Sequence, residues 1–244
     1  MKYSIKGTPF PVVICDLEQD EKILCQSGAM SWMSPNMILE TTSNGGIGKM
    51  FGRFISRESM FQNIYTARGG PGMIAFASRL PGNIKAIEIK PGQSVICQKS
   101  SFLASTLGVN MSVYLNPGIK IGLFGGEGFV FQKFEGKGLL FVELDGSIME
   151  YNLAAGEQLF LSTGHLAMMD GTCHMSVSKI IGAKNILFGG EGLFNTTVLG
   201  PGRIFVQTMP IYKLAMEIGS YIPQQINSCL LYTSDAADDL IGVD

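Results

Sequence analysis

Charged side chains are scarce in this sequence of 244 residues, since Asp, Glu, Lys and Arg together make up only 16% of it. A bundle of long, solvent-exposed helices carries many more charges, so this class is disfavoured. Glycine is abundant instead, with 31 residues, which is roughly twice the average frequency. Glycine favours tight turns, and a hydrophobic content of 46% excludes a disordered chain. We therefore expect a globular protein with many turns.

Cysteine follows no pattern of a metal site or a disulfide framework. There are five cysteines, without a C-x-x-C pair or regular spacing: Cys15, Cys25, Cys97, Cys173 and Cys229. This argues against a zinc module and against a secreted disulfide-rich domain. The first residues lack the apolar run of a signal peptide, and the longest uncharged stretch, 100–119, is interrupted by Gly, Pro, Ser and Asn. We expect a soluble, cytoplasmic protein without a transmembrane segment.

The common catalytic signatures are also missing. The sequence contains no G-x-S-x-G, no P-loop and no Ser, His and Asp in the order of a triad. Its two histidines, His165 and His174, enclose Asp170 and Cys173. Because Cys173 and His174 are neighbours, they face opposite sides of a strand and do not bind one ion. We predict a non-enzymatic protein with no catalytic, metal or cofactor-binding residues; a small-molecule enzyme that uses His165, Asp170 and His174 is an alternative.

An internal repeat organises the second half of the chain. The sequence Leu-Phe-Gly-Gly-Glu-Gly at 123–128 recurs at 187–192, an offset of 64 residues. The same offset places Met-Ser-Val at 111–113 on Met-Ser-Val at 175–177. Identities in register at several separate points indicate two copies of one structural unit.

A weaker copy precedes these two, in which Gly28 corresponds to Gly92 at the same offset. Stacked copies bury their apolar faces against one another, as in other repeat proteins. The sequence therefore predicts three units, near 21–84, 85–148 and 149–210.

Each unit has the pattern of β structure. Apolar and polar residues alternate before a glycine-centred turn at Gly28, Gly92 and Gly156, which is a hairpin signal. Short apolar runs, such as 139–142, are typical of strands covered on both faces. The predicted fold class is all-β: a double-stranded β-helix-like or β-sandwich body of three pseudo-repeated units with a short C-terminal helix.

That helix is predicted over 211–222, where apolar residues fall on one stripe and Pro210 stands at the entry. We expect it to seal an open end or an edge of a single domain that covers 1–223. The tail, 224–244, continues no pattern of the preceding sequence and resembles the in-frame translation of a sequencing adapter. We expect this tail to be artefactual, and a natural disordered terminus is the alternative.

The charge balance gives no sign of a polyanionic partner. The formal net charge is −2, and the segment from Cys229 onward holds four Asp and no Lys or Arg. Without this segment, 18 basic residues face 16 acidic ones, a net charge of +2. Both values are near neutral, so no strong field for nucleic acid or membrane is expected.

Two surface features suggest contacts with a partner. The repeated glycine-rich turns present Glu127 and Glu191, which disfavour phosphate and are weak candidates for an ion pair or an interface. The alternative is that these carboxylates face water. Met30, Trp32 and Met33 beside a turn suggest an apolar patch for a partner, although they are equally suited to filling a β core.

An RNA-binding surface is an alternative that the sequence disfavours. Basic residues near turns and neighbouring aromatic residues offer phosphate contacts and stacking platforms: Lys120, Lys133, Lys137, Lys184, Arg203, Phe129, Phe131 and Phe134. However, aromatic residues at strand spacing are more often core residues, and the near-neutral charge lacks a basic footprint.

These motifs together resemble a known family. The repeated Phe-Gly-Gly-Glu-Gly, the Gly-x-Gly-x-x-Phe-Val strand and the closing Gln-Thr-Met-Pro at 207–210 are similar to the bacterial branch of the altered-inheritance-of-mitochondria protein twenty-four family, over about 1–223. The resemblance implies a fold like that of the tryptophan RNA-binding attenuation protein. It implies no enzymatic activity and no catalytic residues; mitochondrial members are linked to inner-membrane organisation.

The expected function is that of a non-enzymatic, homo-oligomeric binding or scaffolding protein without a cofactor. The expected partner is the protein itself or another protein. An RNA-binding module and a small-molecule-binding protein are the alternatives.

Overall fold

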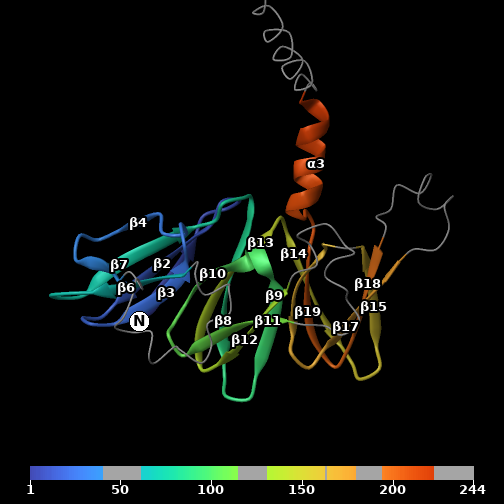
Figure 1. Cartoon of the computed structure of the whole chain (residues 1–244), viewed down its shortest axis with the longest axis horizontal. Helices are drawn as coiled ribbons and strands as arrows, with labels where there is room; N and C mark the ends of the chain where they lie inside the picture. Colours follow the sequence, from blue (N-terminus) through green and yellow to red (C-terminus); the bar gives the residue numbers. More distant parts are fainter. Residues whose placement is uncertain (41–61, 115–130, 163, 180–193, 223–244) are drawn as a thin grey trace, which may run out of the picture. The chain divides into compact units, whose positions relative to one another are not determined.

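The computed structural model describes residues 1–40, 62–114, 131–162, 164–179 and 194–222, and most of them lie in β-strands (Figure 1). The chain divides into a β body, Met1–Pro210, and a second part that begins at Ile211. The all-β prediction is confirmed, with a single α-helix of several turns among the described residues.

Six strand positions, which we name a to f, recur three times in the body after the N-terminal strand β1 (Lys2–Lys6). The first unit contains β2 (Val12–Leu17), β3 (Lys22–Gln26), β4 (Trp32–Met33), β5 (Met37–Glu40), β6 (Gln62–Ala67) and β7 (Gly72–Ala77). The second contains β8 (Gly82–Ile89), β9 (Ser94–Gln98), the 3-10 helix η2 (Lys99–Ser101), β10 (Phe102–Ser105), β11 (Val109–Tyr114), β12 (Phe131–Gly136) and β13 (Gly138–Asp145). The third contains β14 (Ile148–Leu153), β15 (Gln158–Ser162), β16 (Leu166–Asp170), β17 (His174–Lys179), β18 (Phe194–Leu199) and β19 (Gly202–Gln207).

The strands pair in the same way in every unit. Strand f lies between strands a and c, as β7 lies between β2 and β4, and every one of these pairs is antiparallel. Strand e lies between strands b and d, as β6 lies between β3 and β5. Each unit thus consists of an a-f-c half-sheet and a b-e-d half-sheet.

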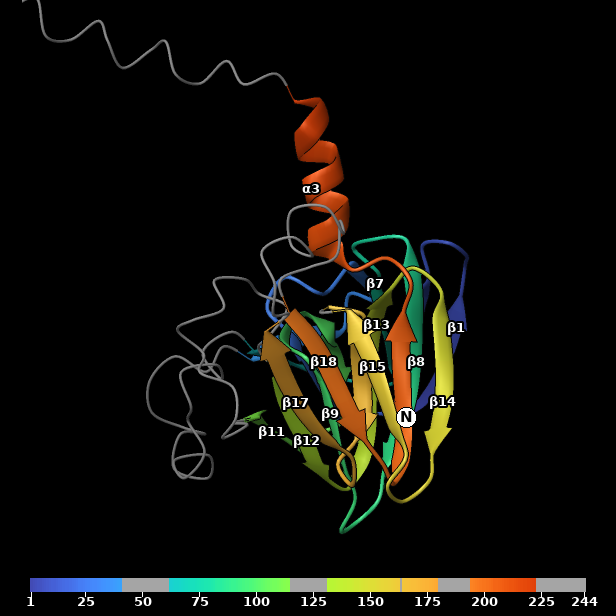
Figure 2. The same cartoon turned by 90° about the vertical axis from the view of Figure 1, so that its right-hand side faces the viewer.

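Successive units share sheets. The b-e-d half of the first unit continues into the c-f-a half of the second, giving the six-stranded order β5-β6-β3-β10-β13-β8. The second and third units join in the same way in the order β11-β12-β9-β16-β19-β14. Figure 2 shows strands of the third unit in front of those of the second. The body is therefore a row of β-sandwiches linked through common sheets.

Each sandwich has its own apolar core. Strands alternate inward and outward residues, and the inward ones of both half-sheets meet. In the first unit, Cys15 of strand a and Cys25 of strand b belong to one buried cluster. In the second, the Phe102 and Phe134 rings stack with centroids 5.5 Å apart. A third cluster around Val198 fills the last sandwich. Burial of such side chains is the main force that holds each unit together.

The first unit begins earlier in the chain than the sequence predicted. The turn between strands a and b carries a positive φ at Gly92 (81°) and Gly156 (82°), and in the first unit at Asp20 (63°). Asp20 is thus the counterpart of Gly92, whereas Gly28 lies between strands b and c. The first unit begins near Val12 rather than near Glu21, because an aspartate here adopts the left-handed conformation that glycine adopts in the later copies.

The Gly-x-Gly motif also has a structural reason. Its second glycine begins strand f in each unit, at Gly72, Gly138 and Gly202. Gly138 has a φ of 154°, and a Cβ there would collide with the Thr106 hydroxyl. A glycine is therefore required where the chain passes close to the turn after strand c.

The C-terminal part contains α3 (Ile211–Tyr221), which confirms the predicted helix. Its apolar side chains recur at helical spacing, as in Ile211, Leu214 and Ile218. The expectation that it seals an edge stays a prediction. No helix in the described part of the chain is long and apolar enough to cross a lipid bilayer.

Candidate functional site

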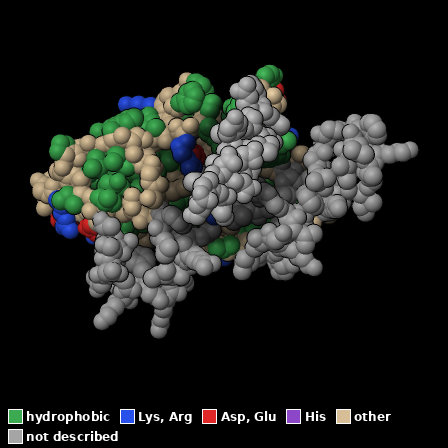
Figure 3. Space-filling view, turned by 45° about the horizontal axis from the view of Figure 1, so that its top comes forward, with side chains coloured by type: hydrophobic (Ala, Val, Ile, Leu, Met, Phe, Trp, Pro, Cys, Tyr) green, Lys and Arg blue, Asp and Glu red, His purple; other side chains and the backbone are tan. Residues whose placement is uncertain are grey.

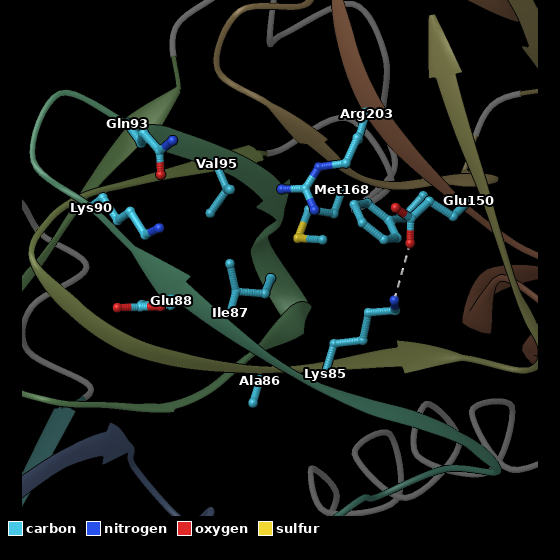
Figure 4. A pocket seen from close by; sticks show the side chains of 11 residues that line it. Lys85, Ala86, Ile87, Glu88, Lys90, Gln93, Val95, Glu150, Met168 and Arg203 are labelled. Atoms are coloured by element: carbon cyan, nitrogen blue, oxygen red, sulfur yellow. Dashed lines mark hydrogen bonds and ion pairs between the residues drawn. The ribbon is translucent and has the colours of Figure 1, made fainter.

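A groove of about 390 Å³ opens where the edge strand β8 of one sheet approaches β9, β14, β16 and β19 of the next (Figure 4). A smaller hollow of about 210 Å³ adjoins it and shares part of its lining. The groove therefore lies between the second and third units, where two sheets meet.

Three cations and three carboxylates surround the groove and the adjoining hollow: Lys85, Lys90, Arg203, Glu88, Glu150 and Asp170. Two of the cations are held in ion pairs. The Lys85 ammonium lies 3.4 Å from a Glu150 carboxylate oxygen, and Figure 4 shows this pair. Arg203 donates from Nε and from its backbone N–H to Asp170, at 3.1 and 3.0 Å. The side-chain hydrogen bond to Asp170 raises the pKa of the Arg203 guanidinium.

The floor of the groove is apolar. Met168 is buried there, and the Phe205 ring lies beside it on β19. The Lys85 ammonium is 4.6 Å from the centroid of that ring, and the Arg203 guanidinium carbon is 5.8 Å from it. Both cations thus interact with the Phe205 π face as well as with their carboxylates.

This arrangement is suited to a small polar ligand more than to a polyanion. Equal numbers of positive and negative groups cancel at a distance, whereas nucleic acid needs an excess of positive charge. A compact polar molecule would meet the polar side chains of the lining, such as Gln93 and Lys90, because Met168 and Phe205 are almost wholly buried. The sequence pointed only to Arg203 and Asp170 among these residues, and it assigned them to different roles, an RNA contact and an enzyme site. The others form one site only through pairing of strands that are far apart in the chain.

The structure places His165, Asp170, Cys173 and His174 in different surroundings. The His165 ring nitrogen Nδ1 is 2.8 Å from the Gln207 carbonyl oxygen, while His174 is exposed on β17. Cys173 is buried beside the third core, and Asp170 is engaged with Arg203. Among the described residues, no three His, Cys, Asp or Glu side chains come close enough to hold a metal ion.

The buried thiols are poor nucleophiles. Burial raises the pKa of Cys15 to about 12 and that of Cys25 to about 12, because desolvation penalises the thiolate. Burial likewise raises the pKa of Cys97 and of Cys173. Since the thiolate is the reactive form, these four cysteines act as apolar core residues at neutral pH.

The residues considered for RNA contact do not form a stacking surface where the structure describes them. Phe131 and Phe134 are buried in the cores, so their rings are not available to bases. Lys133 forms an ion pair with Glu135 at 2.6 Å. Three further candidates, Lys120, Lys184 and Phe129, lie outside the described residues, as do Glu127 and Glu191.

A buried amide network, which the sequence did not reveal, joins the second and third units. Gln207 donates from Nε2 to the Gln98 side-chain oxygen at 3.1 Å and to the Gly164 carbonyl at 2.7 Å. Gln98 donates in turn to the Leu166 carbonyl at 2.8 Å. Gln207 also accepts from the Asp145 N–H. The glutamine of the closing Gln-Thr-Met-Pro motif thus has a structural role.

The fold and the groove define a protein of repeated β-sandwich units that share sheets. This chain belongs to the family described as Mitochondrial biogenesis AIM24, whose model matches residues 3–209. The family resemblance carried by the glycine-rich motifs is thereby confirmed. The likeness to the fold of the attenuation protein stays a prediction.

Two relatives from Streptococcus pyogenes are similar over nearly the whole chain. The uncharacterized protein M6_Spy0233 of serotype M6 is 29% identical over 236 residues, which are 93% of each chain. The crystal structure of protein SPYM3_0169 superimposes with a TM-score of 0.72 at 26% identity, covering 91% of this chain and 99% of that one. The second of these relatives has the same overall fold.

Proposed function

We propose that this protein is a non-enzymatic, self-associating scaffold, which acts by binding rather than by chemistry. The observation that carries the proposal is the sharing of sheets: each six-stranded sheet is built half from one unit and half from the next. Such an architecture extends by adding units through strand pairing, and each addition buries apolar surface. The buried thiols and the paired Asp170 support a role without a nucleophile.

Light scattering on the purified full chain, together with the ratio of absorbance at 260 and 280 nm, tests this function. The expected result is a nucleic-acid-free assembly with a mass that is a multiple of the 26.3 kDa chain. A monomer at every concentration would contradict the scaffold. An assembly that retains RNA, and releases it as salt is raised, would favour the RNA-binding alternative.

The groove beside Phe205 supports a second candidate, a small-molecule-binding protein. Its volume lies in the range of ligand pockets, and six of its eleven lining residues are polar or charged, which suits a polar ligand. A screen of small polar metabolites by thermal shift tests this candidate with two variants, Phe205→Leu in the floor and Leu107→Lys at a distant turn. A ligand that stabilises the wild type and Leu107→Lys, but not Phe205→Leu, would support it; no stabilising ligand would argue against it.

A further inference from the structure

The row of sandwiches ends in two unmatched half-sheets. At its start, the sheet of order β1-β2-β7-β4 ends on the c strand β4, which has no b strand beside it. At its end, the three-stranded sheet β15-β18-β17 ends on the b strand β15, which has no c strand beside it. Among the described residues, β4 pairs only with β7 and β15 only with β18. These two strands lie at opposite ends of the body (Figure 1).

The two six-stranded sheets inside the chain show how neighbouring half-sheets join, and we call these two joins the internal junctions. In each, strand b of one unit pairs antiparallel with strand c of the next: β3 with β10, and β9 with β16. Leu24 lies opposite Ser105 in the first junction, and Ile96 lies opposite Met169 in the second. The register is identical in the two, since these residues hold equivalent positions in their units. The first junction consists of only two opposed pairs, so a short strand suffices.

The unmatched strands expose large apolar side chains at the junction positions. Phe160 of β15 occupies the place of Ile96, and it is 69% exposed where Ile96 is 2% exposed. Met33 of β4 occupies the place of Met169, and it is 36% exposed, next to Trp32 at 46%. Figure 3 shows hydrophobic side chains gathered over the end of the body that carries the first unit. The sequence left open whether Met30, Trp32 and Met33 form a patch or fill the core. In the structure, Trp32 and Met33 are exposed, whereas Met30 packs against the first core.

We propose that β15 of one copy pairs antiparallel with β4 of a second copy of this chain. Continuing the internal register places Phe160 opposite Met33 and Leu161 opposite Trp32. The three-stranded and four-stranded sheets then become one sheet of seven strands. Six of these strands follow the order of the two sheets inside the chain, and β1 is added at the edge beside β2. Because the two surfaces differ, the contact is head to tail, and it generates a closed ring or an open filament. This inference rests on the scaffold function and names the surface through which it works.

Charged substitutions at the two edges test the surface. Phe160→Lys and Met33→Lys each place a charge at the exposed edge, which opposes strand addition without altering a core residue. We expect each to weaken association at least tenfold in sedimentation velocity, measured across a concentration series. Leu107→Lys, which changes a partly exposed apolar residue in a turn, is the matched control and should associate like the wild type.

Disulfide trapping tests the register and the direction. In a Cys229→Ser background, a mixture of the Met33→Cys and Phe160→Cys single variants should yield a covalent dimer on mild oxidation. Opposed residues of antiparallel strands lie within the separation that a disulfide spans. Replacing Phe160→Cys by Gln158→Cys, two residues along β15, should lower the yield severalfold.

The outcomes separate the surface from the function. An assembly that persists in both charged variants and gives no mixed dimer would overturn this surface, while the scaffold function would stand. Dimers formed by Met33→Cys alone would indicate β4 pairing with itself and would also overturn it. A wild-type chain that is monomeric throughout would overturn both the surface and the scaffold.

Discussion

An ion pair at the boundary between the first and second units is the clearest target for a stability measurement. Glu143 on β13 is only 7% exposed. One of its oxygens accepts from Arg79 Nε at 2.6 Å and from a terminal guanidinium nitrogen, and the other accepts from the Arg79 backbone N–H at 3.1 Å. Ser78 donates its hydroxyl to the same carboxylate at 3.4 Å. The segment after β7 is thus held against the second unit by a buried charge.

Removing the guanidinium leaves that carboxylate with fewer donors. Hydrogen bonds to charged groups contribute about 1.5–3 kcal/mol, and breaking a fully buried pair costs about 3–5 kcal/mol. The Arg79 side chain is 54% exposed, so solvent screening places this pair near the lower range. We expect Arg79→Met to lower the free energy of unfolding by about 2 kcal/mol.

A double-mutant cycle with Glu143→Gln isolates the pairwise energy, measured by urea denaturation under conditions where the transition is two-state. We expect a coupling of about 2 kcal/mol. The control is the exposed pair of Arg68 and Asp20, whose side chains are 50% and 56% exposed. Its cycle, with Arg68→Met and Asp20→Asn, should give less than about 1 kcal/mol. A coupling for the Arg79 pair no larger than the control would refute the argument from burial.

Three further predictions follow from the pKa shifts and the glycine geometry. Burial raises the pKa of Cys25 from 9.0 to about 12. The contribution of this protonated thiol to stability is therefore present below pH 9 and is lost as the pH rises towards 12. The free energy of unfolding should fall over that range, and less steeply in Cys25→Ala; equal slopes would contradict this. The pKa of the Glu40 carboxyl is lowered chiefly by its hydrogen bond from the Lys22 ammonium. The contribution of this carboxylate to stability is therefore present above the ordinary pKa of a glutamate, and it is lost as the pH falls through the lowered pKa of Glu40. Lys22→Met should therefore cost about 1 kcal/mol near pH 7 and less near pH 2.5, and a cost independent of pH would count against the pairing. Gly138→Ala should cost about 1–3 kcal/mol by thermal denaturation, whereas Gly219→Ala in α3, with open space around its Cβ, should cost nothing measurable.

The sequence was sufficient for the fold class because the local signals agree with one another. Alternating residues before Gly92 and Gly156 are strands a, and the run 139–142 lies in strand f. The helix over 211–222 was found from spacing alone, since an amphipathic stripe needs no distant partner to be visible. Local periodicity of this kind predicts element type well.

The predicted start of the first unit was wrong because the repeats were aligned on their glycines. In the turn between strands a and b, Asp20 of the first unit has the positive φ that Gly92 has in the second unit. Aspartate tolerates a positive φ better than most residues. The spacing also changes: Asp20 precedes Gly92 by 72 positions, whereas Gly156 follows it by 64. A constant offset therefore aligned Gly92 with Gly28, which serves another turn. Strand pairing shows the equivalence, because it depends on which strands are neighbours rather than on residue type.

The groove and the buried amide network could not be predicted from the sequence, because their residues are far apart in the chain. Long stretches of chain separate Lys85, Glu150 and Arg203, and no local sequence pattern predicts that their strands lie side by side. The same holds for Gln98 and Gln207, which are bonded across 109 positions. Polar residues at strand positions are expected to face water, so their convergence depends on the sheets being shared between units. The feature hardest to foresee, the sheet that passes from one unit to the next, thus positions both the groove and the network.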